Sequence, residues 1–134
     1  MSKALTTIRR LLLEMRLYGW TGARRYDRAL QAATECTRLF PDEASYWTNR
    51  ALCEVQLAKY DDALKSAETC LRKDPCSPGG HLWKAKALQG QGNLLPAILA
   101  YRDAMVHAGD DNHLHRFIER QVEECSRQIV MRDI

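Results

Sequence analysis

Apolar residues recur at helical spacing along most of the chain, and turn-forming residues interrupt them at regular intervals. The pattern predicts seven helices and no strands, since apolar positions three and four residues apart form one stripe on a helix. The predicted helices span residues 3–22, 26–39, 43–58, 60–73, 79–91, 94–108 and 112–131. We expect both terminal helices to pack one apolar stripe against the others. These stripes are Leu11, Leu12, Met15 and Leu17 in the first helix, and Leu114, Phe117, Ile118, Val122 and Cys125 in the last.

A five-residue motif returns every 34 residues, at 26–30, 60–64 and 94–98. Each copy carries an alanine at its fourth position: Ala29, Ala63 and Ala97. A helix-stopping residue follows twelve positions later, because proline lacks an N–H and glycine accepts a left-handed cap. These stops are Pro41, Pro75 and Gly109. The repeating unit is therefore one helix pair, which is too small to bury its own apolar face, so stacked neighbours must supply the core.

These residues, together with Trp47 and Ala51 in the middle repeat, resemble the tetratricopeptide repeat family. The resemblance implies an all-α fold, a right-handed superhelical array of three helix pairs plus a C-terminal capping helix. We expect a single domain over residues 1–134, with repeats at about 10–43, 44–77 and 78–111 and the capping helix at about 112–131.

Composition is that of an ordinary folded domain, with 134 residues, 46% hydrophobic and 28% charged. The apolar run at 11–13 lies between Arg10 and Glu14, so it predicts neither a signal peptide nor a membrane span. A net charge of +3 with both signs interleaved is too weak to indicate a nucleic-acid-binding face. We expect a cytoplasmic protein, with the nucleus as the alternative, and no membrane partner.

The five cysteines show neither a disulfide framework nor C-x-x-C metal spacing. Cys36, Cys53 and Cys70 are expected to be free thiols in the helical core, where cysteine behaves as a small apolar residue. His113 and His115 point in different directions on a helix and do not form a metal clip. No phosphate-binding loop or catalytic constellation is present. We expect no enzyme activity, no cofactor and no small-molecule substrate.

The family resemblance implies that the first helices of successive repeats line a concave groove that holds extended peptides. The segment 46–51 is similar to the middle-repeat motif of chaperone-binding arrays, which grip a C-terminal carboxylate. Asn49 stands at the clamp asparagine of that motif. An amide there can donate to a carboxylate or a backbone carbonyl without adding charge.

The other four clamp positions hold different residues: Glu14, Tyr18, Gly79 and Trp83. A carboxylate needs several charge-assisted donors to offset its desolvation, and Glu14 opposes it. We therefore expect a peptide of another chemistry, with a chaperone C-terminal tail as the less favoured partner. The candidate peptide-binding residues are Asn49, Tyr18, Leu52, Trp83, Lys86 and Arg50. Aromatic anchors favour this reading; the alternatives are that Trp83 packs between repeats and that the Arg50 stem covers a neighbouring helix.

The predicted function is a non-catalytic protein-protein interaction module, an adaptor or co-chaperone-like domain that binds a partner segment in the groove. Two alternatives stay open from the sequence. One is a scaffold subunit of a larger complex, packed through its convex face or terminal helices. The other, less favoured, is an RNA-associated helical repeat.

Overall fold

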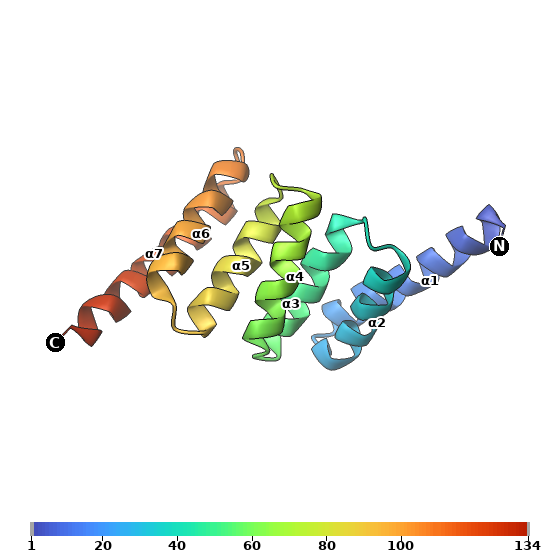
Figure 1. Ribbon diagram of the computed structural model, residues 1–134, viewed down its shortest axis with the longest axis horizontal. Helices are drawn as coiled ribbons and strands as arrows, with labels where there is room; N and C mark the ends of the chain where they lie inside the picture. The colour runs from blue at the N-terminus through green and yellow to red at the C-terminus, as the bar shows by residue number, and fades with distance from the viewer. Residues whose placement is uncertain (1, 134) are drawn as a thin grey trace.

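The computed structural model describes residues 2–133, which fold into seven helices and no strand. The helices lie side by side along the long axis of the molecule, with the two chain ends at opposite extremes (Figure 1). The predicted all-α array of three helix pairs and one further helix is confirmed. The helices are α1 (Lys3–Gly22), α2 (Tyr26–Leu39), α3 (Ala44–Gln56), α4 (Tyr60–Lys73), α5 (Pro78–Gly90), α6 (Leu94–His107) and α7 (Asn112–Arg132).

The turn inside each helix pair is built in the same way three times. The backbone N–H of Arg25, Lys59 and Asn93 donates to the carbonyl five residues earlier, at 2.9, 2.8 and 2.9 Å. The residue before each of these adopts a left-handed conformation, with φ of 58° at Arg24, 58° at Ala58 and 82° at Gly92. This is the Schellman arrangement, which usually places glycine at the left-handed position. The 34-residue period thus extends to backbone geometry, although two of the three turns lack the glycine.

Two of the three connections that follow a second helix use side-chain caps instead, whereas Glu43 before α3 forms no such cap. Ser77 Oγ accepts from the Gly80 N–H at 3.0 Å, and Pro78 occupies the first helical position, where its missing N–H is harmless. Asp111 Oδ1 caps α7 in the same way by accepting from the Leu114 N–H at 3.0 Å. The second helices end at Leu39, Lys73 and His107, just before the predicted stops.

Small side chains fill the sites where helices approach closely. Ala29, Ala63 and Ala97 are completely buried, and so are Cys36 and Cys70 at another site of the same period. The expectation that Cys36, Cys53 and Cys70 are free core thiols is confirmed. At the C-terminal end, Ile118 and Cys125 are buried, and Leu114, Phe117 and Val122 pack around them. The predicted apolar stripe of the last helix therefore does face the array.

The predicted stripe of the first helix is right at Leu17 and wrong at its other three residues. Leu13 and Leu17 are the buried residues of α1, whereas Leu11, Leu12 and Met15 are more than half exposed. Helix α1 carries apolar side chains of its own on several faces, so their spacing alone did not identify the face that packs. Contact with α2 and α3 selects Leu13 and Leu17, because both join the core cluster formed with Ala29 and Ala33. A second apolar face of α1 is left uncovered.

The first helices lie closer to one another than the second helices do. Helix α3 packs directly against α5, and side chains of α1 reach α3, whereas no comparably close packing joins α2 to α4 or α4 to α6. First helices on the inner side of a curved array produce this difference. Any groove of the expected type is therefore formed by α1, α3 and α5.

Candidate peptide-binding groove

Six side chains of the first helices occupy two positions of the 34-residue period. Tyr18, Leu52 and Lys86 share one position, and Met15, Asn49 and Trp83 share the other. The two positions are three residues apart on each helix, so their side chains are neighbours on one face. We call these six residues the first-helix strip.

Asn49 and Tyr18 meet across α1 and α3 in this strip. Burial raises the pKa of the Tyr18 phenol, the Glu14 carboxylate raises it further, and a hydrogen bond from Asn49 opposes both. The Asn49 amide also donates to the backbone carbonyl of Ser45 at 2.8 Å. That contact holds the amide on the surface of α3 while its carbonyl oxygen stays available as an acceptor. The structure thus brings together two of the sequence-predicted site residues.

A polar network fills the α1 corner beside them. Tyr46 is buried, and its hydroxyl donates to Glu14 while accepting from Arg10 Nε at 2.7 Å. Arg10 Nη2 also pairs with Glu43 Oε2 at 3.0 Å. Burial and the Glu14 hydrogen bond both raise the pKa of Tyr46 well above its usual range, so the hydroxyl remains a donor. Two carboxylates share one guanidinium here, which leaves the corner net negative.

The α5 side of the strip differs from the carboxylate clamp for a steric reason. A Cβ atom at Gly79 would stand 2.8 Å from Thr48 Cγ2, closer than side-chain contacts normally come. The start of α5 therefore approaches α3 through a glycine, and a lysine does not fit at this clamp position without movement of Thr48. Both Trp83 and Lys86 are half-buried on α5.

Lys86 bridges toward the last helix. Its Nζ lies 5.4 Å from the centroid of the Phe117 ring, within the range of a cation–π contact. Burial lowers the pKa of this lysine. Leu52, at the equivalent position of α3, packs partly into the core of the first repeat. Of these two side chains, the lysine supplies the cationic end of the strip and the leucine an apolar contact.

Arg50 lies apart from the other candidates. Its Nη1 donates to Thr37 Oγ1 at 3.1 Å, its Nε is 3.8 Å from Glu54 Oε1, and its guanidinium lies over the Trp47 ring at 5.4 Å. These contacts direct the side chain along α3 and toward α2, as expected of a basic stem that covers a neighbouring helix. Glu54 is itself buried and accepts from the Ser66 hydroxyl, and burial raises its pKa.

Met15 and Leu11 were missed as candidate binding residues. Met15 stands 34 residues before Asn49, and Leu11 stands 34 residues before the exposed Ser45. Both were predicted to lie in the buried stripe of the first helix, so their correspondence to Asn49 and Ser45 was not considered. Both are more than half exposed, so α1 adds two apolar side chains beside the polar corner. The period itself contained the signal.

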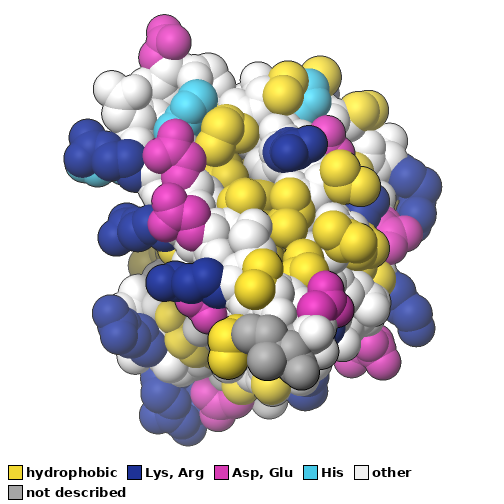
Figure 2. Space-filling model, turned by 90° about the vertical axis from the view of Figure 1, so that its left-hand side faces the viewer, with side chains coloured by type: hydrophobic (Ala, Val, Ile, Leu, Met, Phe, Trp, Pro, Cys, Tyr) yellow, Lys and Arg dark blue, Asp and Glu magenta, His cyan; other side chains and the backbone are white. Residues whose placement is uncertain are grey.

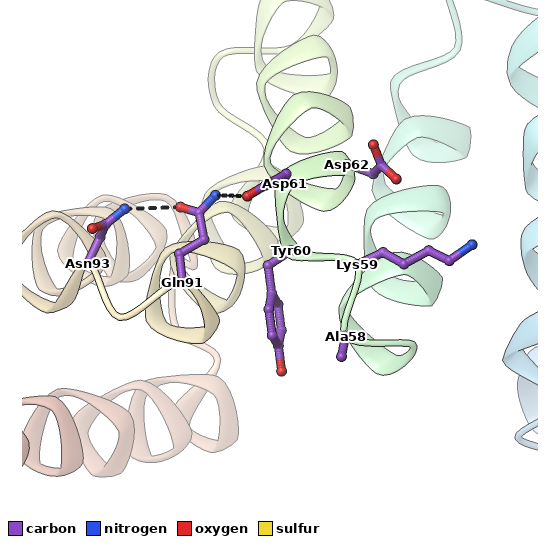
Figure 3. A pocket seen from close by; sticks show the side chains of 7 residues that line it. All are labelled: Ala58, Lys59, Tyr60, Asp61, Asp62, Gln91 and Asn93. Carbon is purple, nitrogen blue, oxygen red and sulfur yellow. Dashed lines mark hydrogen bonds between the residues drawn. The ribbon is translucent and has the colours of Figure 1, made fainter.

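The largest surface hollow lies elsewhere, at the edge where the α3–α4 and α5–α6 turns meet (Figure 3). Gln91 Nε2 donates to Asp61 Oδ1 at 2.7 Å, and Asn93 Nδ2 donates to Gln91 Oε1 at 3.1 Å. The Tyr60 ring lies below this chain, so close to Gly90 that a Cβ there would come within 2.3 Å of it. These contacts join the second and third repeats.

Among residues 2–133, no cluster of three or more histidine, cysteine or carboxylate side chains is arranged to hold a metal ion. No described helix is both long and apolar enough to span a bilayer.

Sequence comparison places the chain among helical repeat proteins. Residues 22–75 match the family model described as Tetratricopeptide repeat. Over 86 residues the chain is 33% identical to Small glutamine-rich tetratricopeptide repeat-containing protein 2 of Saccharomyces cerevisiae, covering 64% of this chain and 25% of that protein. Over 103 residues it is 28% identical to Hsp70-Hsp90 organizing protein 1 of Glycine max, covering 77% of this chain and 18% of that protein. The chain thus spans a quarter or less of the length of these relatives.

Solved structures agree on the fold. The TPR2B domain of yeast Sti1, solved as a complex with an Hsp70 peptide, has a TM-score of 0.83 at 20% identity, covering 90% of this chain and 98% of that one. The first TPR domain of Spaghetti (RPAP3), bound to the HSP90 peptide SRMEEVD, has a TM-score of 0.80 at 16% identity, covering 90% and 93%. With the period, the three helix pairs and the repeated turn, these matches show that the chain has the tetratricopeptide repeat fold, and residues 22–75 match the model of that family.

Proposed function

We propose that this chain is a non-catalytic interaction module that binds an extended segment of a partner protein along the first-helix strip, with Asn49 at the centre. The observation that carries the proposal is the placement of six side chains at two positions of the 34-residue period on the first helices α1, α3 and α5. The Tyr18 phenol and the Asn49 amide lie close enough to influence each other. Co-chaperone domains with the same fold, bound to Hsp70 and HSP90 peptides, support a peptide as the ligand.

The strip favours an amphipathic internal segment over a free C-terminus. Its apolar contacts come from Met15, Leu52 and Trp83, and Asn49 offers both a donor and an acceptor to a peptide backbone. Glu14 and Glu43 repel an incoming carboxylate at the α1 corner. On the α5 side, Gly79 supplies no cation. Lys86 is the one cation among the six strip residues, and its Nζ lies over the Phe117 ring, so a carboxylate would gain at most one charge-assisted donor for the hydration that it loses.

The test begins with a peptide selected from a random display library on the wild-type protein, with SRMEEVD and SGPTIEEVD measured in parallel. Each peptide is titrated with a free and with an amidated C-terminus by fluorescence anisotropy. We expect amidation to change the affinity of the selected peptide little. A loss of about tenfold or more, which is about 1.4 kcal/mol, would show that the carboxylate is the recognised group.

Substitution then locates the site. Asn49→Ala should weaken binding by about 1 kcal/mol or more, because a buried partner group loses its hydrogen bond. The helical circular dichroism spectrum should stay unchanged, since the Asn49 side chain takes no part in the core. Asn93→Ala removes an exposed amide at the α5–α6 turn and serves as the control. Equal affinities for the two variants would exclude Asn49 from the binding site.

A scaffold role through the back of the array is the second candidate, and one observation favours it. Leu95, Leu99 and Val106 of α6 are more than half exposed. The equivalent positions of α2 hold Asp27, Gln31 and Arg38, and those of α4 hold Asp61, Lys65 and Arg72, all exposed. Figure 2 views the C-terminal end of the array and shows hydrophobic side chains gathered in a band there. If this surface is a permanent interface, Leu99→Glu should abolish co-purification of a partner while leaving peptide binding to the strip intact.

A further inference from the structure

The outer face of α1 carries an apolar seam that nothing in the described part of the chain covers. Leu5, Ile8, Leu12 and Met15 follow one another at intervals of three, four and three residues, and each is more than half exposed. This alternation is the spacing by which one helix packs lengthwise against another. Leu5 and Ile8 belong to the N-terminal half of α1, which extends beyond its neighbours in the array (Figure 1). We call these four residues the α1 seam.

A hollow continues the seam toward the end of the helix. The next position in the spacing is Gly19, where a Cβ atom would meet nothing within 4 Å. The hollow has a volume of about 420 Å³. Its lining residues are Leu12, Met15, Arg16, Gly19, Trp20 and Ala23. A recess bounded by a methionine and a tryptophan suits the insertion of one large apolar side chain, as a knob enters a hole between helices.

The surroundings of the seam are strongly basic. Residues 1–28 hold seven basic and two acidic side chains, a net charge of +5, whereas the whole chain carries +3. Both acids are engaged, since Glu14 contacts Arg10 and Tyr46, and Asp27 pairs with Arg25 at 3.5 Å. The basic side chains in this part that form no ion pair with any residue among 2–133 are Lys3, Arg16, Arg24 and Arg28. Arg9 and Arg10 are paired with Glu35 and Glu43 from outside this segment, so the four unpaired side chains supply the positive charge beside the seam.

We propose that the α1 seam docks an amphipathic helix of a partner protein, whose apolar stripe is flanked by aspartate and glutamate. The spacing of the seam matches the apolar stripe of a helix, and the hollow accommodates a large apolar side chain. The unpaired arginines attract acidic residues on both sides of that stripe. This surface is separate from the contact between Tyr18 and Asn49, although Met15 borders both. It adds a second binding surface to the one on the first-helix strip.

A second copy of the chain fits the same surface less well. In an antiparallel pairing of two α1 helices the residues beside the seam face their own copies, so that Arg9 and Arg16 of one chain approach those of the other. Like charges at such positions disfavour association. An anionic lipid surface would attract the same arginines, but a flat interface leaves the recess unfilled. Both occupants are outcomes of the test.

The experiment uses the full chain and two designed helical peptides about three heptads long. Both peptides carry leucine at the seam positions and one tryptophan as the anchor; one has glutamate at the flanking positions, the other lysine. Binding is measured by isothermal titration calorimetry. We expect the glutamate peptide to bind on the order of tenfold or more tightly than the lysine peptide, and the difference to shrink at high salt.

Variants test the location. Ile8→Glu combined with Leu12→Glu places two carboxylates in the seam and should abolish binding of the glutamate peptide. Leu95→Glu combined with Leu99→Glu makes the same change on exposed leucines of α6 and should leave binding unaltered. None of these four side chains belongs to the buried core, so circular dichroism should show both variants folded.

Four results would overturn the proposal. The first is the absence of binding by either peptide, and the second is equal binding of both. The third is a concentration-dependent dimer in sedimentation velocity that the seam variant abolishes, which would identify a second copy as the occupant. The fourth is seam-dependent co-sedimentation with phosphatidylserine vesicles, which would identify a lipid surface. Loss of binding to the first-helix strip in Asn49→Ala has no bearing on these outcomes, so the two proposals fail independently.

Discussion

The repeated turn allows a reciprocal test of the backbone geometry. The left-handed position holds Ala58 in the second turn, at φ 58°, and Gly92 in the third, at φ 82°. A left-handed conformation costs a residue with a Cβ about 1 to 2 kcal/mol. Glycine avoids that cost, but it gives the unfolded chain extra entropy worth about 0.4 to 1 kcal/mol. The difference predicts that Ala58→Gly stabilises the protein by roughly 0.5 to 1 kcal/mol.

The reverse substitution should have the opposite sign. Gly92→Ala introduces the strain without a compensating contact, since its Cβ would meet only the Arg132 guanidinium, at 3.3 Å. We expect destabilisation of roughly 0.5 to 1 kcal/mol, measured by urea unfolding followed at 222 nm. Gly19→Ala is the control. It lies inside α1 at an ordinary helical φ with open space around it, so the same change should stabilise by up to about 1 kcal/mol.

The signs of the three changes in unfolding free energy test whether left-handed backbone strain determines the stability of these turns. If Ala58→Gly destabilises the protein while Gly19→Ala stabilises it, the methyl group of Ala58 contributes more than its backbone strain costs. If Gly92→Ala is neutral, the third turn tolerates a conformation that differs from the one described. Either outcome would refute the argument that one strained turn is repeated three times.

Three further predictions concern the core, the last helix and pH. Ala63→Leu should overpack a fully buried helix contact and lower the free energy of unfolding by about 1 to 3 kcal/mol; an unchanged melting temperature would contradict the register. Truncation after Gly109 removes α7 from the apolar surface around Tyr101 and should give an aggregation-prone or partly unfolded chain; a monomer of unchanged stability would contradict the capping role. Burial raises the pKa of Cys53 from 9.0 to about 11, so only the unfolded thiol ionises between these values and stability should fall as pH rises through that window. The loss should be up to about 2 kcal/mol, and Cys53→Ala should reduce the slope of unfolding free energy against pH.

The helix pairs were predictable because the signals that define them are local and repeated. Alanines at one site of the 34-residue period mark close helix contacts, and proline or glycine twelve residues later marks each helix end. In the folded chain each of the three repeats packs in the way that these signals indicate. The left-handed turns were harder to foresee, since only Gly92 has the expected residue. Arg24 and Ala58 adopt the conformation because the two helices that they connect must turn at that point.

The packed face of α1 could not be identified from spacing. Apolar residues at 11, 12, 13, 15 and 17 cover most of the circumference of a helix, so several faces are equally consistent with burial. The choice depends on the complementary surface of α2, where Ala29 and Ala33 leave room for Leu13 and Leu17. A helix with apolar residues on more than one side is the feature that should have indicated a second contact surface.

The candidate groove shows how a polar network decides what a conserved architecture can bind. Glu14 replaces a clamp cation, and it is held in place because Tyr46 donates to it and Arg10 balances its charge. Three residues from two helices therefore have to change together before that corner can attract an anion. Glu14→Lys alone would place a lysine beside Arg10 and leave the buried Tyr46 hydroxyl without its acceptor, which costs about 1 to 3 kcal/mol. The residue that differs from the clamp at this corner is thus tied into the contact between α1 and α3 through Tyr46 and Arg10.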